Sequence, residues 1–291
     1  MRYLRIGSSV EPLLLLIKTK KRFDFALLEV KPFSFTFFGE NMRIENTKIP
    51  LYGVFFFVGM FAAAVIAAIL SKKKKIEFFD FLCAVVFVMI GAMVGAKLLF
   101  IIVSWKEIMR LHLSFLEIIR GGFVFYGGLI GGILAILLFG KTFKVKLADY
   151  VDVFACALPL GHAFGRVGCL FGGCCYGIEY DGFGHVCYCS AANVNTPLET
   201  PLFPVQLLEA FLLLCLFFVL LFLLLKGKAR GKIVFVYAAI YAVLRFVLEF
   251  LRGDAERGVL WGISTSQWIS LLLFAGAIFL LFYKKKEKKI E

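Results

Sequence analysis

Seven stretches of the sequence are long and apolar enough to cross a lipid bilayer. A helix needs about 20 mostly apolar residues to span the hydrocarbon layer. The stretches cover residues 49–71, 78–104, 121–140, 147–171, 205–225, 233–251 and 265–283. A backbone inside lipid must satisfy its own hydrogen bonds, and the alternating pattern of a membrane β-barrel is absent. The sequence therefore predicts an all-α integral membrane protein with seven transmembrane helices.

The composition argues against a water-soluble domain. Hydrophobic residues make up 61% of the 291 residues and charged residues only 18%, whereas soluble domains have about 45–50% and about 25%. A net charge of +13 would suggest nucleic acid in a soluble protein. Here the lysines cluster at the ends of the apolar stretches, where membrane proteins keep them. We therefore expect membrane lipids rather than nucleic acid as the surroundings.

Basic residues are concentrated on one side of the predicted membrane. They follow the first, third, fifth and seventh stretches, at Lys72–Lys75, Lys141, Lys144, Lys146, Lys226, Lys228, Arg230, Lys232, Lys284–Lys286, Lys288 and Lys289. The opposite loops hold only Lys106, Arg110, Arg120, Arg252 and Arg257. The positive-inside rule therefore places the C-terminus in the cytosol and the start of the first helix outside.

The N-terminal residues 1–48 do not fit this topology, because they place many basic residues on the outer side. A start at Met42 would remove most of them. We expect residues 1–41 to be a poorly ordered extension or a start assigned too early, and residues 42–291 to form the seven-span domain. The run Phe33–Phe38 alternates like a strand.

Ionisable residues inside membrane spans are costly and are candidates for function. For Lys97 and Asp152, a functional role and a side chain that merely snorkels to water are equally consistent with the sequence. In the sixth span, Tyr241, Arg245 and Glu249 are four residues apart and share one helix face, which Arg252 continues. One interpretation is an ion pair that locks the helices together. The other is an anion site in which Glu249 holds a guanidinium that binds phosphate through paired hydrogen bonds.

Glycine-rich segments surround two further candidates. Arg166 lies in the broken, glycine-rich end of the fourth span, where a backbone or ligand can come close. Gly127 and Gly128 lie near the start of the third span and repeat at Gly131 and Gly132, a spacing typical of tightly packed helices. Packing is the favoured interpretation of these glycines, and Tyr126 adds a phenol beside them.

Five cysteines crowd the outer segment 169–204: Cys169, Cys174, Cys175, Cys187 and Cys189. We expect one or two disulfides there, because an extracytoplasmic compartment permits them. A metal site is an alternative that the spacing does not favour, so we expect no metal ligands and no cofactor. Cys83, Cys156 and Cys215 lie inside spans and are expected to be small apolar fillers.

Together these residues resemble the prolipoprotein diacylglyceryl transferases of bacterial inner membranes. The resemblance covers most of residues 44–285. It rests on segments in a fixed order: Ile49–Gly53, Gly95–Lys97, Gly121–Gly128, Ala148–Tyr150, Gly165–Gly168 with Gly177, Pro204–Glu209, Tyr241–Arg252 and Ser266–Ser270. It implies transfer of a diacylglyceryl group from phosphatidylglycerol to the lipobox cysteine of a prolipoprotein signal peptide, in the bacterial cytoplasmic membrane.

The resemblance also implies roles for individual residues. Arg166, Arg245, Tyr126 and Glu249 would be catalytic. Substrate would be bound by Arg166, Arg245, Arg252, Tyr241, Gly127, Gly128, Gln206 and Gln267.

The chain departs from the family pattern at several polar positions. Where the family usually has a His, this chain has Tyr126. Cys169, Gly172 and Cys174 replace two Asn and a Glu of the family. Phe203 replaces the usual His before Pro204. A divergent member with the same lipid site but another transfer or a thiol-redox task is therefore the main alternative. A non-catalytic lipid-binding or transporter-like bundle is a third.

Overall fold

The computed structural model describes residues 35–38, 41–44, 51–112, 114–189, 195–254 and 259–283. Its helices are α2 (Leu51–Lys73), α3 (Phe78–Val103), α4 (Trp105–Arg110), α5 (Phe115–Arg120), α6 (Phe125–Phe143), α7 (Leu147–Gly172), α8 (Val205–Leu225), α9 (Ile233–Leu248), the short 3-10 helix η1 (Glu249–Leu251) and α10 (Thr265–Phe282). Within these described ranges, seven helical stretches are long and apolar enough to cross a membrane. The predicted seven-span helical fold is confirmed.

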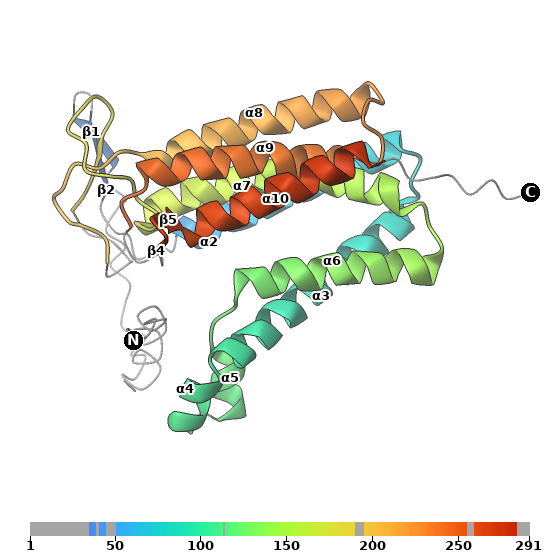
Figure 1. Cartoon of the computed structure of the whole chain (residues 1–291), viewed down its shortest axis with the longest axis horizontal. Coiled ribbons are helices and arrows are strands. Elements are labelled where there is room, and N and C mark those ends of the chain that lie inside the picture. Colours follow the sequence, from blue (N-terminus) through green and yellow to red (C-terminus); the bar gives the residue numbers. More distant parts are fainter. Residues whose placement is uncertain are drawn as a thin grey trace, which may run out of the picture. The chain divides into compact units, whose positions relative to one another are not determined.

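The chain forms two compact units (Figure 1). Within residues 71–150, α3 packs along α6, and α4 and α5 form the connection between them. We call this the α3–α6 unit. The other unit, which we call the α7–α10 unit, contains most of α2, α7 from Val151 onward, helices α8 to α10 and the strands.

Glycines bring α3 and α6 into backbone contact. A Cβ on Gly127 would overlap the carbonyl oxygen of Gly95, and one on Gly131 would overlap that of Gly91. The packing interpretation is therefore confirmed for Gly127 and Gly131. Gly128 is different, because a Cβ there would lie 3.4 Å from the Ala92 oxygen, which is ordinary contact.

Lys97 stabilises the turn that precedes α6. Its Nζ donates hydrogen bonds to the carbonyl oxygens of Ile118 (3.2 Å), Gly121 (3.0 Å) and Gly122 (3.0 Å), and it lies 4.3 Å from the Phe123 ring centroid. The ammonium thus binds backbone carbonyls at the C-terminal end of α5 and in the turn that follows it. This local role explains its position better than snorkelling does.

The third span begins later than the sequence predicts, at Phe125 rather than Gly121. Gly121 is extended and forms the C-terminal cap of α5. The Val124 N–H bonds to the Ala96 oxygen of α3. Hydropathy included these apolar residues in the span, although their backbone belongs to the connection.

Asp152 likewise has a structural partner. It is fully buried, and its carboxylate accepts hydrogen bonds from the backbone N–H groups of Gly231 (2.6 Å) and Ile233 (3.1 Å). Those groups lie at the N-terminal end of α9, where the helix leaves its own donors unpaired. Asp152 of α7 therefore caps α9, so its interpretation as a snorkelling residue is wrong.

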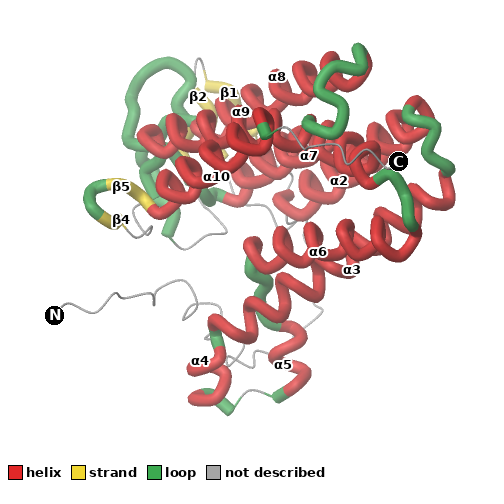
Figure 2. The backbone as a smooth tube through the Cα atoms, turned by 45° about the vertical axis from the view of Figure 1, so that its right-hand side comes forward, coloured by secondary structure: helices red, strands yellow, loops and turns green. Residues whose placement is uncertain are grey.

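Short strands cover one end of the α7–α10 unit (Figure 2). β1 (Phe35–Phe38) pairs antiparallel with β2 (Asn41–Ile44), which runs parallel to β3 (Val186–Tyr188). A β4–β5 hairpin (Val259–Leu260, Ile263–Ser264) leads into α10. We call this region the strand end; it includes the C-terminal ends of α7 and α9 and the N-terminal ends of α8 and α10.

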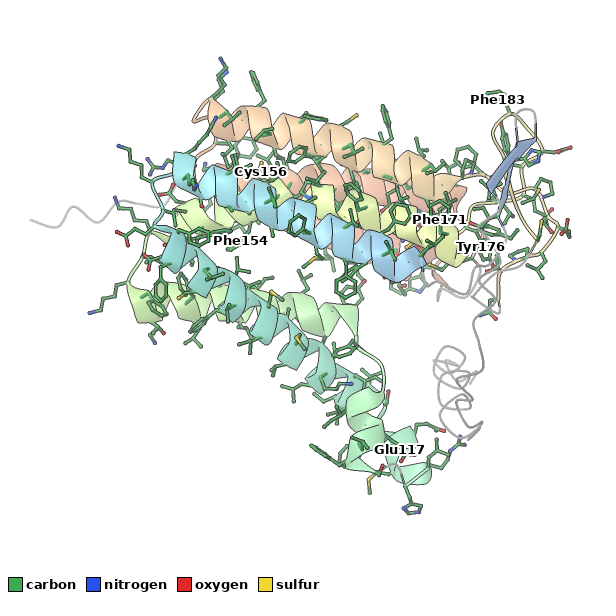
Figure 3. The ribbon with its side chains drawn as sticks, turned by 180° about the vertical axis from the view of Figure 1, so that it is seen from behind. Glu117, Phe154, Cys156, Phe171, Tyr176 and Phe183 are labelled. Carbon is green, nitrogen blue, oxygen red and sulfur yellow. The ribbon has the colours of Figure 1, made fainter. Side chains whose placement is uncertain are left out.

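A small hydrophobic core joins the strands to the end of α7. It consists of Ile44, Leu170, Val186, Tyr188 and Leu202, each at most 2% exposed. Phe171 and Tyr176, labelled in Figure 3, lie near this end of α7. Strand β1 agrees with the alternation of Phe33–Phe38. The rest of the predicted N-terminal extension, residues 1–34 and 39–40, lies outside the described residues.

Candidate functional site

Arg245 and Glu249 form the ion pair that their spacing predicts. Arg245 Nη2 lies 2.7 Å from Glu249 Oε2 and donates a hydrogen bond to Ser266 Oγ of α10 at 3.2 Å. Both side chains are largely buried, with 11% and 7% exposed. Glu249 and Ser266 therefore fix the direction of the guanidinium at the strand end.

Arg166 has a carboxylate partner that the sequence reasoning missed. Its Nη2 lies 3.0 Å from Glu209 Oε1 in the first turns of α8, with 14% and 3% of the side chains exposed. Glu209 appeared only as part of a motif, although a carboxylate at the start of an apolar span was itself a signal. Arg166 Nε is buried and has no hydrogen-bond partner among the described residues.

Tyr241 and His162 lie near both ion pairs. The rings pack edge to face, with centroids 5.3 Å apart, and Tyr237 stacks on Tyr241 at 5.8 Å. Both guanidinium groups are near enough to act electrostatically on Tyr241 and His162. The structure thus brings Arg166, Arg245 and Tyr241 into one neighbourhood, and adds His162, which the sequence reasoning did not single out.

Arg252 follows η1 and faces Asp254. Its Nε and Nη2 donate to Asp254 Oδ1 (2.9 Å) and Oδ2 (2.7 Å), a bidentate pair. Arg166, Arg245 and Arg252 therefore each have a carboxylate within 3.0 Å. The predicted anion-binding arginines lie close together, but each is already neutralised by an acidic side chain.

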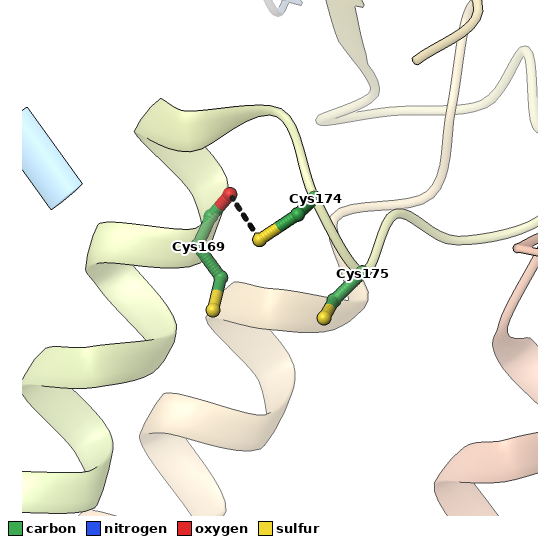
Figure 4. A group of neighbouring side chains, drawn as sticks. All are labelled: Cys169, Cys174 and Cys175. Atoms are coloured by element: carbon green, nitrogen blue, oxygen red, sulfur yellow. Dashed lines mark hydrogen bonds between the residues drawn. The ribbon is translucent and has the colours of Figure 1, made fainter. Parts of the chain in front are cut away.

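Three cysteines gather at the C-terminal end of α7 (Figure 4). Cys169 comes from the last turn of α7, and Cys174 and Cys175 come from the loop that follows. Their sulfur atoms all lie within 4.8 Å of one another. Hydrogen bonds from the Cys169 and Cys174 thiols lower the pKa of Cys175, and the positive charges of Arg252 and Arg166 act in the same direction.

The structure has no disulfide among Cys169, Cys174 and Cys175, where the sequence predicts one or two bridges in this segment. A disulfide that involves Cys187 or Cys189 stays a prediction. Alternation along β3 puts Cys187 on the face opposite to Tyr188. The Tyr188 hydroxyl donates to the Leu170 oxygen of α7 at 2.9 Å, so Cys187 points away from the three cysteines at the end of that helix.

Both predicted glutamines make internal contacts. Gln206 Nε2 donates to the Cys174 carbonyl oxygen at 2.9 Å, which ties the start of α8 to the cysteine loop. Gln267 forms a capping box with Ser264: its Oε1 accepts from the Ser264 N–H at 3.0 Å and its own N–H donates to Ser264 Oγ at 3.2 Å. These contacts give Gln206 and Gln267 structural roles.

The remaining predicted site residues belong to the α3–α6 unit. Tyr126, Gly127 and Gly128 lie in the first turn of α6, and the Tyr126 side chain is about half exposed, at 48%. The structure defines the packing of Gly127 against α3, as described above. A contact of these three residues with substrate stays a prediction.

Known proteins match nearly the whole chain. A model of the family described as prolipoprotein diacylglyceryl transferase matches residues 40–283. Phosphatidylglycerol–prolipoprotein diacylglyceryl transferase 2 of Clostridium perfringens is 32% identical over 249 residues, covering 86% of this chain and 96% of the relative. The transferase of Clostridium tetani is 33% identical, with the same coverage. That of Dehalococcoides mccartyi strain 195 is 28% identical, covering 84% and 93%. The chain therefore belongs to the prolipoprotein diacylglyceryl transferase family.

Proposed function

We propose that this protein transfers a diacylglyceryl group from phosphatidylglycerol to the lipobox cysteine of a prolipoprotein signal peptide. The reaction would take place at the outer face of the bacterial cytoplasmic membrane. The names of the relatives supply both substrates. The positive-inside rule supports the orientation, because it puts the strand end outside.

The chemistry is a displacement at the glyceryl carbon. The substrate thiolate forms a carbon–sulfur bond, the carbon–oxygen bond to phosphate breaks, and glycerol phosphate leaves with the electron pair. The nucleophile belongs to the peptide, because the thiolate is the reactive form of cysteine. The enzyme must therefore bind the head group and stabilise the negative charge that develops on the leaving phosphate.

One observation carries the proposal most directly: the buried Nε of Arg166 has no hydrogen-bond partner among the described residues. A buried donor without a partner is costly, and a phosphate oxygen would satisfy it. We assign Arg166 and Arg245 to the phosphate, with Glu209 and Glu249 holding the two guanidinium groups. Tyr241 would contact the same head group, and Arg252 the departing glycerol phosphate. For Tyr126 we propose a role in orienting the acceptor thiol.

The test is transfer by purified protein in phosphatidylglycerol vesicles, with a lipobox peptide as acceptor and mass spectrometry as readout. The peptide should gain a diacylglyceryl mass, and a peptide with serine at the lipobox position should not. Arg166→Ala and Arg245→Lys should each lower the rate by about 100-fold or more, as loss of a preorganised donor does.

The control for these variants is Arg110→Ala, which removes an arginine whose side chain is 65% exposed and paired within its own helix. It should leave transfer unchanged. Wild-type rates in both Arg166→Ala and Arg245→Lys would refute the assignment of the phosphate site.

A further inference from the structure

We propose that Cys169, Cys174 and Cys175 form a binding site for a thiophilic divalent cation of the zinc type. Their three sulfur atoms lie within 4.8 Å of one another, and Figure 4 shows them at the end of α7 and in the loop after it. Three thiolates around a tetrahedral zinc ion, each about 2.3 Å from the metal, are about 3.8 Å apart. Small movements of the sulfur atoms would therefore complete the metal–sulfur shell.

The backbone conformation of the loop after α7 brings Cys174 and Cys175 back toward Cys169. Gly173 and Cys175 both have positive φ angles, of 69° and 60°. Residues other than glycine rarely adopt this backbone conformation, and those that do are found preferentially at functional sites. The Cys174 N–H bonds to the Cys169 carbonyl oxygen at 3.1 Å, so the chain folds back at once after the helix.

Neighbouring side chains hold this loop in place. Thr196 Oγ1 donates to the Gly173 oxygen at 2.6 Å, and Gln206 Nε2 donates to the Cys174 oxygen at 2.9 Å. The loop is thus fixed from the chain before α8 and from α8 itself. A preformed set of ligands binds a metal with less ordering of the protein.

The surrounding charges fit an anionic metal complex. Three thiolates and one divalent cation carry a net charge of −1. Arg166 and Arg252 are close enough to interact with Cys175, so positive charge is available beside the complex. The three cysteines are only partly buried, which leaves a path for the ion and for a fourth ligand such as water.

Three converging thiols suit a metal better than a disulfide, which would use two and leave the third. Binding forms three metal–sulfur bonds and releases the thiol protons to solvent, without a change of oxidation state. The proposal does not depend on the transfer reaction, because its readout is metal binding.

The experiment uses the full-length protein, reduced and in detergent, with Zn²⁺ and Cd²⁺ as probes. Wild-type protein should retain one equivalent of Zn²⁺ after desalting and show a thiolate-to-cadmium absorption band with Cd²⁺. Cys169→Ser, Cys174→Ser and Cys175→Ser should each weaken Zn²⁺ binding at least about tenfold and reduce the band. Cys83→Ser, which removes a partly buried cysteine of α3, should bind like wild type.

Three results would overturn the proposal. The first is no retained Zn²⁺ in wild-type protein whose thiols are shown to be reduced. The second is an unchanged cadmium band in all three cluster variants. The third is a disulfide among these cysteines in protein isolated from its membrane without reductant, because oxidation removes the ligands. Circular dichroism of each variant establishes that lost binding does not come from lost helix.

Discussion

Two adjacent glycines in the first turn of α6 allow a sharp test of packing against substrate binding. Gly127 and Gly128 are both predicted to contact substrate, yet their surroundings differ. A Cβ on Gly127 would overlap the Gly95 oxygen and lie 2.6 Å from Leu99 Cβ, whereas a Cβ on Gly128 meets its nearest atom at 3.4 Å. Gly127→Ala and Gly128→Ala make the same chemical change in the same turn.

The expected difference in stability follows from these distances. Carbon atoms in good contact are about 3.5–4.0 Å apart, so the new methyl group at 127 is short of this by roughly 1 Å against Leu99. The Gly95 backbone cannot rotate away, and α3 and α6 must separate. Overpacking of this kind costs about 1–3 kcal/mol. At position 128 the methyl group fits. Both variants share the change in helix propensity, so the difference between their free energies of unfolding isolates the packing cost.

Thermal unfolding in detergent, followed by tryptophan fluorescence, measures the effect on packing, and the transfer assay measures the effect on substrate binding. Gly127→Ala should unfold at a lower temperature than Gly128→Ala, and Gly128→Ala should unfold at or above the wild-type temperature. Equal unfolding temperatures for the two variants would show that the α3–α6 contact is not as close as described. A folded Gly128→Ala protein with impaired transfer would assign Gly128 to substrate.

Four other substitutions each test the role of one side chain. Asp152→Ala should destabilise the protein by about 1–2 kcal/mol through loss of the α9 cap, seen as a lower unfolding temperature, whereas Asp152→Asn keeps an acceptor and should lose less. Lys97→Met should cost about 1–3 kcal/mol, because the Gly121 and Gly122 carbonyls lose the Lys97 donor; an unchanged unfolding temperature would contradict that role. Neighbouring thiols and guanidinium groups lower the pKa of Cys175. As the pH is lowered, alkylation of Cys175 should therefore begin to slow at a lower pH than in the denatured chain. Arg252→Gln should raise the pH at which alkylation slows, as mapped by peptide mass spectrometry. Tyr126→His should preserve or raise transfer if the acceptor geometry is that of the family; an inactive, folded variant would show that the phenol has its own role.

Hydropathy and helix periodicity predicted much of the fold and one ion pair. A run of about 20 apolar residues has few alternatives to a membrane helix, so the observed spans agree with the predicted ones within a few residues except at the start of α6. Arg245 and Glu249 are on one helix, and a spacing of four residues brings them together without knowledge of tertiary structure.

Contacts between distant segments were not accessible in the same way. Arg166 and Glu209 lie on different helices, and no periodicity links them. Asp152 and Lys97 looked like charges in need of water, because the backbone groups that they bind become available only where α9 begins and α5 ends beside them. The three clustered cysteines depend on positive φ angles in the loop after α7, which residue spacing does not reveal.

The two buried ion pairs also constrain how the chain enters a membrane. Arg245 and Glu249 are one turn apart, so α9 can enter the bilayer with its charge already neutralised. Arg166 has no such neighbour on α7, and its carboxylate arrives only with the first turns of α8. An unpaired arginine in a membrane span is costly, so the pairing with Glu209 favours insertion of α7 together with α8.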